Sequence, residues 1–196
     1  DESAEIVMFE RGPHVSFSNC ALPFHLSGIV EESEDLVLMS PEEFKNKYNI
    51  DARTRNEVTK IKREENKVVV KDLETGEEYE EKYDKLVLSP GANPICPDSI
   101  EGINRDNVFT IRNVVDISNL KSYIEENNIE DVAVIGAGYI GLEVAENLHL
   151  DGKNVNLIEA LPQILSPFDY DMAQILHKEL YDQGINLILD DALQKI

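Results

Sequence analysis

Three glycines and one acid have the spacing of a dinucleotide-binding turn. Gly136, Gly138 and Gly141 form a G-x-G-x-x-G pattern, and Glu159 lies about 20 residues further on. Gly136 would allow a tight turn, Gly138 would let the backbone approach a pyrophosphate, and Gly141 would let a helix lie close to a strand. We therefore predict NAD(H) binding at a helix N-terminus. The competing interpretation is a glycine-rich turn without a ligand.

Glu159 also bears on the choice of nucleotide. Its carboxylate could accept hydrogen bonds from the adenosine ribose hydroxyls, and its charge would repel a 2′-phosphate. Residues 160–162 supply no Arg or Lys to hold such a phosphate. We therefore expect NADH to be preferred over NADPH.

Cys20 is the second residue that could do chemistry. Pro23 suits the first turn of a helix, so Cys20 would lie at or just before a helix N-terminus, where the reactive thiolate is favoured. The residues alone nevertheless favour a buried, inert cysteine over a nucleophile. Cys96 lies in a loop between prolines with no activating feature, and we regard it as incidental.

These residues need particular elements to position them. The apolar run 132–135 is typical of a parallel strand buried on both faces, and a second apolar run, 155–158, ends at Glu159. Between them, apolar residues recur at helical spacing. The flanking elements that we predict are a helix capped by Asp116, an amphipathic helix with Met172, Ile175, Leu176 and Leu180 on its apolar face, and a buried strand at 185–189.

The first half of the chain repeats the strand-then-acid pattern, because the apolar run 6–9 ends at Glu10. A capping box with proline at the first helical position begins a helix at residues 40–43. Short strands at 58–61, 67–71 and 77–80 predict an antiparallel meander. A buried strand at 86–88 should lead into Ser89-Pro90-Gly91, followed by a linker.

Composition excludes several classes of function. The 196 residues carry 18 Lys and Arg against 39 Asp and Glu, a formal net charge of −21. Such acidity argues against nucleic-acid partners and against anionic membranes. No apolar stretch approaches the roughly 18 residues of a membrane span. The two cysteines are far apart in sequence, so we expect no disulfide scaffold and a cytoplasmic location.

Three stretches occur in an order that points to one family: SFSNCALP after a strand ending in FER, LSPGANP after a strand, and VAVIGAGYIGLE. Together they resemble the single-cysteine class of FAD-dependent pyridine nucleotide-disulfide oxidoreductases. The likeness is closest to the coenzyme A-disulfide reductases, with persulfide reductases, NADH oxidases and NADH peroxidases as relatives. As in that class, Cys20 has no second cysteine nearby in sequence.

The resemblance implies a relay from NADH through FAD to Cys20, which would reduce coenzyme A disulfide or a related disulfide or persulfide. In the oxidases and peroxidases the cysteine cycles through sulfenic acid instead. Ser16 and Asn19 are the implied substrate-binding residues. The implied cofactor-binding residues are Glu10, Ser89, Pro90 and Gly91 for FAD, and Gly136, Gly138, Tyr139, Ile140, Gly141, Glu143 and Glu159 for NAD(H).

Two of these assignments rest on the resemblance alone. It makes Tyr139 an aromatic gate over the flavin, with Glu143 beside it. The residues by themselves favour simple packing for Tyr139 and a solvated helix acid for Glu143.

The fold that we expect is α/β, with two Rossmann-like units that have parallel sheets and a small antiparallel meander. Residues 1–112 would form a partial FAD-binding-type domain with the redox cysteine, and residues 113–196 an NAD(H)-binding domain truncated at its C-terminus. The family's first FAD glycine motif, second FAD segment and C-terminal dimerisation domain are absent from the 196 residues. We therefore expect a fragment, inactive alone, of a homodimeric enzyme. The alternatives are an NADH oxidase or peroxidase, or a non-catalytic redox sensor.

Overall fold

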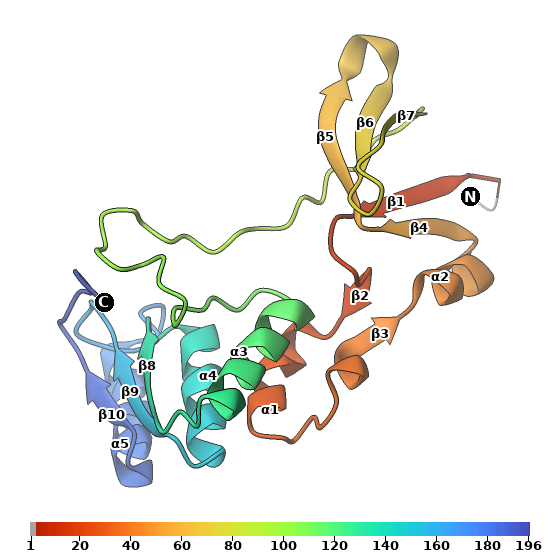
Figure 1. Ribbon diagram of the computed structural model, residues 1–196. Helices are drawn as coiled ribbons and strands as arrows, with labels where there is room; N and C mark the ends of the chain where they lie inside the picture. Colours follow the sequence, from red (N-terminus) through yellow and green to blue (C-terminus); the bar gives the residue numbers. More distant parts are fainter. Residues whose placement is uncertain (1–2) are drawn as a thin grey trace. The chain divides into compact units, whose positions relative to one another are not determined.

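The computed structural model describes residues 3–196, which form two compact units (Figure 1). The first unit comprises the residues up to Ser18 together with Val37–Ala92, and the second comprises Asn19–Leu36 with Asn93–Ile196. The segment that carries Cys20 therefore clusters with the second unit. The predicted domain boundary between residues 112 and 113 stays a prediction.

The first unit contains a parallel pair of strands. Strand β1 (Ile6–Glu10) pairs with β4 (Ile50–Thr54), and Glu10 lies opposite Thr54. Strands β2 (Ser16–Phe17) and β3 (Val37–Met39) form a short antiparallel pair. Helix α2 (Pro41–Tyr48) packs on β4 and begins with the predicted capping box, in which Ser40 and Glu43 each accept the other's backbone N–H.

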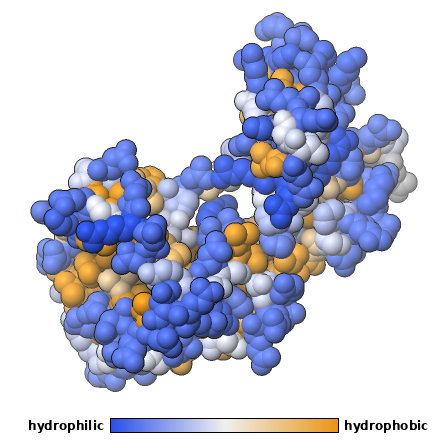
Figure 2. Space-filling model, in the orientation of Figure 1, coloured by the Kyte–Doolittle hydropathy of each residue, from blue (hydrophilic) through white to orange (hydrophobic). Residues whose placement is uncertain are grey.

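The predicted antiparallel meander is confirmed. Its strands are β5 (Asn56–Lys62), β6 (Lys67–Asp72) and β7 (Glu78–Lys82), with the 3-10 turn η3 (Arg63–Glu65) between the first two. Val68 and Val70 are its buried residues, whereas Lys and Glu side chains cover its surface (Figure 2). Burial alternates along β6, where Val68 and Val70 are buried and Val69 between them is half-buried, because successive side chains point to opposite faces of the sheet.

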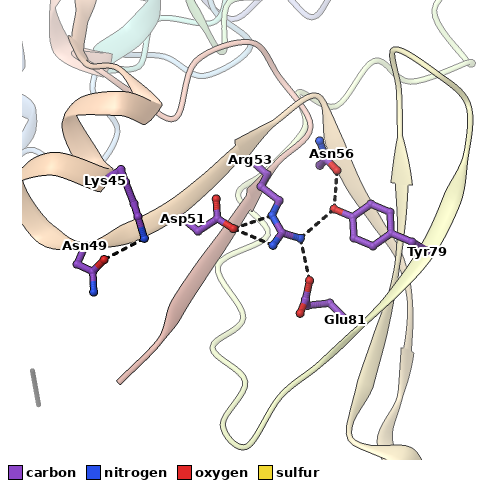
Figure 3. Close-up of polar contacts among 7 residues, drawn as sticks. All are labelled: Lys45, Asn49, Asp51, Arg53, Asn56, Tyr79 and Glu81. Atoms are coloured by element: carbon purple, nitrogen blue, oxygen red, sulfur yellow. Dashed lines mark hydrogen bonds and ion pairs between the residues drawn. The ribbon is translucent and has the colours of Figure 1, made fainter. Parts of the chain in front are cut away.

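Arg53 ties β4 to the meander (Figure 3). Its guanidinium donates to Asp51 on the same strand at 2.9 Å, to Glu81 on β7 at 2.8 Å and to the Tyr79 hydroxyl at 3.3 Å. The charge also lies over the Phe9 ring of β1, 5.5 Å from the ring centroid. Partial burial acts to lower the pKa of Arg53, but the hydrogen bonds to Tyr79, Glu81 and Asp51 outweigh burial and raise it.

Two predictions for this unit are wrong. Residues 86–88, expected as a buried strand, pair with no strand among residues 3–196 and are exposed. Their β propensity is high, but a strand needs a partner for its backbone groups. Conversely, β4 was not predicted, because its sequence IDART contains the charged residues Asp51 and Arg53. In the structure these two charges pair with each other along the strand.

The second unit contains a three-stranded parallel sheet in the order β10-β9-β8. The strands are β8 (Asp131–Ile135), β9 (Asn154–Ile158) and β10 (Asn186–Ile188). Helix α4 (Tyr139–Leu150) joins β8 to β9 and packs on both, and α5 (Tyr170–Gln183) joins β9 to β10. This β-α-β-α-β order confirms the Rossmann-like α/β class predicted for the unit.

Three shorter elements and one long helix complete the second unit. The 3-10 turn η1 (Asn19–Ala21) leads into α1 (Leu22–Leu26), and η2 (Ser33–Leu36) follows. Helix α3 (Val114–Glu126) precedes β8, and α1 packs against both α3 and α4. The fully buried Leu36, Ile117, Leu148 and Leu157 belong to the core of this unit.

Three details of the second unit differ from the predictions. Asn113, not Asp116, is the N-cap of α3, and Asp116 is the reciprocal acid of its capping box. Strand β8 is half-exposed rather than buried on both faces, because it is the edge of the three-stranded sheet; Ile135 is 49% exposed. On α5 Met172, Ile175 and Leu176 of the predicted apolar face are exposed and Leu180 is half-buried, and the buried residues are Ala173 and His177 instead.

No helix in the part of the chain that the structure describes is long and apolar enough to cross a membrane.

Candidate functional site

The glycine turn between β8 and α4 is built as its spacing predicts. Gly136 has φ 94°, in the left-handed region that favours glycine, and its N–H donates to the Ile158 carbonyl at 2.8 Å. A Cβ on Gly141 would lie 1.8 Å from the Gly136 carbonyl oxygen, so the helix can approach the turn only if that residue is glycine. A Cβ on Gly138 would meet no described atom within 4 Å.

The start of α4 has the properties of an anion site. Gly138 is its N-cap and has no side chain that could accept from the first amides of the helix, so these N–H groups remain available as donors. The helix has 12 residues and its N-terminal end carries partial positive charge. The open space at Gly138 lies beside these donors, so the residues present fit the pyrophosphate of a dinucleotide.

Glu159 is fixed by two backbone amides. One carboxylate oxygen accepts from Ala137 in the glycine turn at 2.8 Å, and the other accepts from Leu161 at 2.9 Å. The acid therefore ties the end of β9 to the turn after β8. This position at the tip of β9 is the one from which the predicted ribose contact would be made.

The segment after Glu159 is hydrogen-bonded to the glycine turn and to α5. The Leu165 N–H donates to the Ala137 carbonyl at 2.9 Å, and Leu165 holds a positive φ of 45°. The Ile164 N–H donates to Nε2 of His177 at 3.2 Å. Burial lowers the pKa of His177, which favours the neutral ring that this bond requires. The sequence prediction missed His177, because no pattern in the sequence shows that the segment after Glu159 folds back on α5.

The predicted nicotinamide-side residues lie in the first turns of α4. Tyr139 is 60% exposed, and its ring lies edge-on to Phe168 with centroids 6.2 Å apart. Ile140 is exposed beside it, and Glu143 is half-exposed one turn further. The gate and flavin-side roles of Tyr139 and Glu143 stay predictions.

Cys20 lies in the 3-10 turn that precedes α1, and its side chain is exposed. The expected burial of Cys20 is therefore wrong, whereas its reactivity stays untested. The expected place just before a helix with Pro23 in its first turn is confirmed. Cys96 is also an exposed free thiol. The neighbouring Asn19 accepts a hydrogen bond from the Arg112 guanidinium at 3.1 Å.

The buried side-chain amide of Asn147 joins α1, the helix after Cys20, to α4, the helix after the glycine turn. Asn147 on α4 is fully buried; its Oδ1 accepts from the hydroxyl of Ser27, the C-cap of α1, at 2.6 Å. Its Nδ2 donates to the Glu143 carbonyl at 2.8 Å. No sequence signal distinguished Asn147 from a surface residue, because its neighbours in helical spacing include both apolar and charged residues.

The remaining predicted residues belong to the first unit. Glu10 ends β1, and its carboxylate accepts from the Gly12 N–H at 2.7 Å. Ser16 lies in β2 opposite Met39. Ser89, Pro90 and Gly91 are exposed and outside regular structure. The structure thus gathers Asn19, Cys20 and the glycine turn at Gly136–Gly141 in one unit, whereas the predicted FAD-side residues and Ser16 belong to the other.

No cluster of His, Cys, Asp and Glu among residues 3–196 could hold a metal ion.

Known proteins are similar to this chain along its whole length. The chain is 39% identical over 197 residues to an NADH oxidase of Methanocaldococcus jannaschii, and 36% identical over 196 residues to a coenzyme A disulfide reductase of Staphylococcus haemolyticus. Both matches cover 100% of the chain and 44% of the relative, so the chain spans less than half the length of these relatives.

A solved structure of the reduced CoADR-RHD protein of Bacillus anthracis superposes with a TM-score of 0.96 at 40% identity. It covers 100% of this chain and 35% of that protein. The family model for pyridine nucleotide-disulphide oxidoreductases matches residues 1–196. The chain belongs to this family, whose members bind FAD and NAD(H).

Proposed function

We propose that the enzyme containing this chain uses NADH and FAD to reduce coenzyme A disulfide, or a related disulfide or persulfide, through Cys20. The observation that carries the proposal is the exposed thiol of Cys20, held in the same compact unit as the dinucleotide turn. The coenzyme A disulfide reductase of S. haemolyticus is similar along the whole chain, which supports this choice of substrate.

NADH binds at the start of α4 in this proposal. The free amides of the first turn hold the pyrophosphate, and the missing Cβ of Gly138 lets it approach. Glu159 accepts the ribose hydroxyls and disfavours a 2′-phosphate, which makes NADH the preferred coenzyme. Tyr139 and Ile140 expose apolar surface at the same helix end, where the nicotinamide half of the coenzyme would lie.

Cys20 performs the thiol chemistry. Its thiolate attacks one sulfur of the disulfide, forms a mixed disulfide and releases the other half as a thiolate, which takes one proton from solvent. Two electrons and one proton then return Cys20 to the thiolate and release the second thiol. The sum is one NADH, one proton and one disulfide converted to NAD⁺ and two thiols. Asn19, next to Cys20 in the chain, holds the substrate in this proposal. The substrate-binding role of Ser16 stays a prediction.

FAD, when bound, supplies the two-electron transfer between the nicotinamide and the thiol. The chain's own contribution to that cofactor is Glu10, placed at the tip of β1 as a ribose acceptor, and the exposed Ser89-Pro90-Gly91 loop. Glu10 fits this role because its strand ends as β9 ends at Glu159, with the carboxylate at the carboxyl end of a parallel strand.

A pair of cysteine variants tests the proposal. In the FAD-loaded enzyme, Cys20→Ser should reduce NADH-dependent reduction of coenzyme A disulfide to background, because the attacking thiolate is gone. Bleaching of the flavin absorbance by NADH should remain. The matched control, Cys96→Ser, removes the other exposed thiol and should leave the rate within about twofold. Loss of activity in the control and not in Cys20→Ser would reverse the assignment.

A second candidate is an NADH oxidase or peroxidase in which Cys20 cycles through sulfenic acid. The observation that favours it is the 39% identity to the M. jannaschii NADH oxidase. Steady-state assays with NADH against coenzyme A disulfide, oxygen and peroxide separate the two. A higher kcat/KM for oxygen or peroxide than for the disulfide would select the oxidase or peroxidase. An enzyme that binds NADH but reduces none of the three would be a redox sensor.

We further propose that the enzyme is a cytoplasmic homodimer. The two cysteines are free in the structure, which suits a reducing compartment. Light scattering of the purified enzyme measures its mass directly, and a monomer would contradict the dimer.

A further inference from the structure

The contact between Arg112 and Asn19 fixes which way one amide faces. A guanidinium carries only donors, so it can be contacted by the oxygen of a carboxamide and never by its NH₂ group. Arg112 donates to Oδ1 of Asn19 at 3.1 Å. The NH₂ group of Asn19 is therefore not directed at Arg112, and it keeps two donors for another partner on the residue that precedes Cys20.

Arg112 itself is held in place. Its backbone N–H donates to Asp116 at 3.0 Å, and Asp116 also closes the capping box of α3 with Asn113. The 13-residue helix α3 in turn packs against α1, which begins two residues after Cys20. The orientation of the exposed Asn19 side chain is thus set from a rigid helix end, while Asn19 and Cys20 themselves remain open to solvent.

Building on the function proposed above, we propose that Arg112 is a positioning residue that presents Asn19 as a hydrogen-bond donor to the thiol substrate. The site then selects disulfides that carry an acceptor, such as an amide carbonyl, a few atoms from the reacting sulfur. The pantetheine arm of coenzyme A carries amide carbonyls of this kind. Disulfides with bare alkyl groups gain nothing from the donor, because a donor without a partner must stay hydrated.

Thiol-disulfide exchange at Cys20 tests this assignment without turnover. In a Cys96→Ser background, the Cys20 thiolate is mixed with N,N′-diacetylcystamine, which has amide carbonyls, or with diethyl disulfide, which has no hydrogen-bonding group. Each exchange forms the mixed disulfide with Cys20 and releases one thiolate. The ratio of the two rate constants reports the donor alone, because any change in thiolate reactivity affects both probes.

The expected ratio favours diacetylcystamine in the wild-type enzyme and falls about tenfold in Asn19→Asp and in Arg112→Met. Asn19→Asp keeps an oxygen for Arg112 but removes the donor, and Arg112→Met releases the amide. The double variant should fall no further than Asn19→Asp, because Arg112 acts through Asn19. Arg112→Lys should keep part of the ratio. Arg105→Met, at an exposed arginine of the same unit, should keep all of it.

An unchanged ratio in Arg112→Met would overturn the assignment, and so would equal losses with both probes, which indicate only a structural role. Steady-state kinetics of the FAD-loaded enzyme tests the proposed function separately. There, Arg112→Met should raise the KM for coenzyme A disulfide about tenfold with kcat within twofold. If the wild-type enzyme does not reduce coenzyme A disulfide with NADH, the proposed function is wrong, and the exchange ratio still decides the role of Arg112.

Discussion

Glu10 and Glu159 end parallel strands in different units, and each accepts the backbone N–H of the residue two positions later. The distances are 2.7 Å from Gly12 and 2.9 Å from Leu161. We call this arrangement of strand end, acid and turn a corner. It is the same in both units, because an acid at the end of an apolar strand can accept a hydrogen bond from the turn that follows it. What differs is the neighbouring strand of each.

Glu159 lies beside a glycine turn, and its second oxygen accepts from Ala137 at 2.8 Å. Glu10 lies beside β4, whose register places Thr54 opposite it. A strand-then-acid pattern therefore specifies a corner, and only the adjacent glycine turn and helix make a dinucleotide site of it. The predictions below test this difference, from the largest expected effect to the smallest.

The largest expected difference is in cofactor binding by the 196-residue polypeptide. It should bind NADH, because the turn, the helix end and Glu159 are in place. It should purify without colour and bind no FAD, because Glu10 and the exposed Ser89-Pro90-Gly91 loop offer only about a few kcal/mol against the cost, commonly estimated at about 4 kcal/mol or more, of fixing a large cofactor. Calorimetry with NADH and absorbance in the visible measure the two. A yellow polypeptide with stoichiometric FAD would erase the contrast.

Alanine substitutions of glycines should separate the two corners next. Gly141→Ala places a Cβ 1.8 Å from a backbone oxygen, so it should lower the free energy of unfolding by about 2 kcal/mol. Gly12→Ala meets only the movable Glu10 carboxylate at 3.1 Å and should cost well under about 1 kcal/mol. Urea unfolding measures both. Equal costs would mean that the helix can shift away from the turn.

Gly138→Ala is the matched control for Gly141→Ala within the same glycine turn. Its Cβ meets no described atom, so the stability should change little, while the affinity for NADH should fall because the Cβ occupies the space predicted for the pyrophosphate. A variant with unchanged NADH affinity in calorimetry would contradict the pyrophosphate site at Gly138.

Replacing each acid by its amide compares the corners directly. Glutamine has one acceptor and one NH₂ group, so Glu159→Gln must leave either Ala137 or Leu161 facing a donor, at a cost of about 1–3 kcal/mol. Glu10→Gln can still turn its oxygen to Gly12 and should cost about 0.5 kcal/mol. Urea unfolding measures both; an equal cost would show that the second amide of Glu159 contributes nothing.

Glu159→Gln has a second expected effect in the full enzyme. It should bring the ratio of kcat/KM for NADH over that for NADPH closer to one, because the charge that repels a 2′-phosphate is gone. A preference of the wild-type enzyme for NADPH would contradict the role given to Glu159.

The sequence predicted those features that are set locally or by close backbone approach. The glycine turn, the capping box of α2 and the meander each follow from residues within a few positions of one another. Features that depend on neighbours distant in sequence were missed. Residues 86–88 have strand propensity but pair with no strand in the described part of the chain, and Asn147 is buried by a helix more than a hundred residues away.

The site divides along the same line. The place of Cys20 before a helix with Pro23 in its first turn was predictable from the residues, but its exposure was not, because burial depends on α3 and α4 packing around α1. The Arg112 contact to Asn19 was also beyond prediction, since 93 residues separate the two. His177 is the third such residue, because its bond to Ile164 depends on how the segment after Glu159 folds back on α5.

His177 gives the smallest expected effect, and it belongs only to the Glu159 corner. Burial holds its pKa below the ordinary value of about 6.5, so the unfolded chain takes up a proton that the folded chain refuses. The contribution of His177 to stability is therefore fully present above about pH 6.5, and it is lost progressively as the pH falls from there toward the lowered pKa. Protonated His177 would also be unable to accept the Ile164 N–H, which would loosen the segment that packs on the glycine turn.

His177→Gln isolates this effect, because an amide oxygen can accept from Ile164 and does not titrate. The difference in unfolding free energy between wild type and this variant should be constant from pH 8 to about pH 7 and should move against the wild type below about pH 6.5. Carboxylates interfere little in this window: Glu80, whose hydrogen bond from Lys62 lowers its pKa to about 2, loses its contribution only as the pH falls below 4.5. Hydrogen exchange at the Ile164 amide should accelerate in the wild type over the same range. A pH-independent difference would show that the hydrogen bond from Ile164 to neutral His177 contributes nothing to stability.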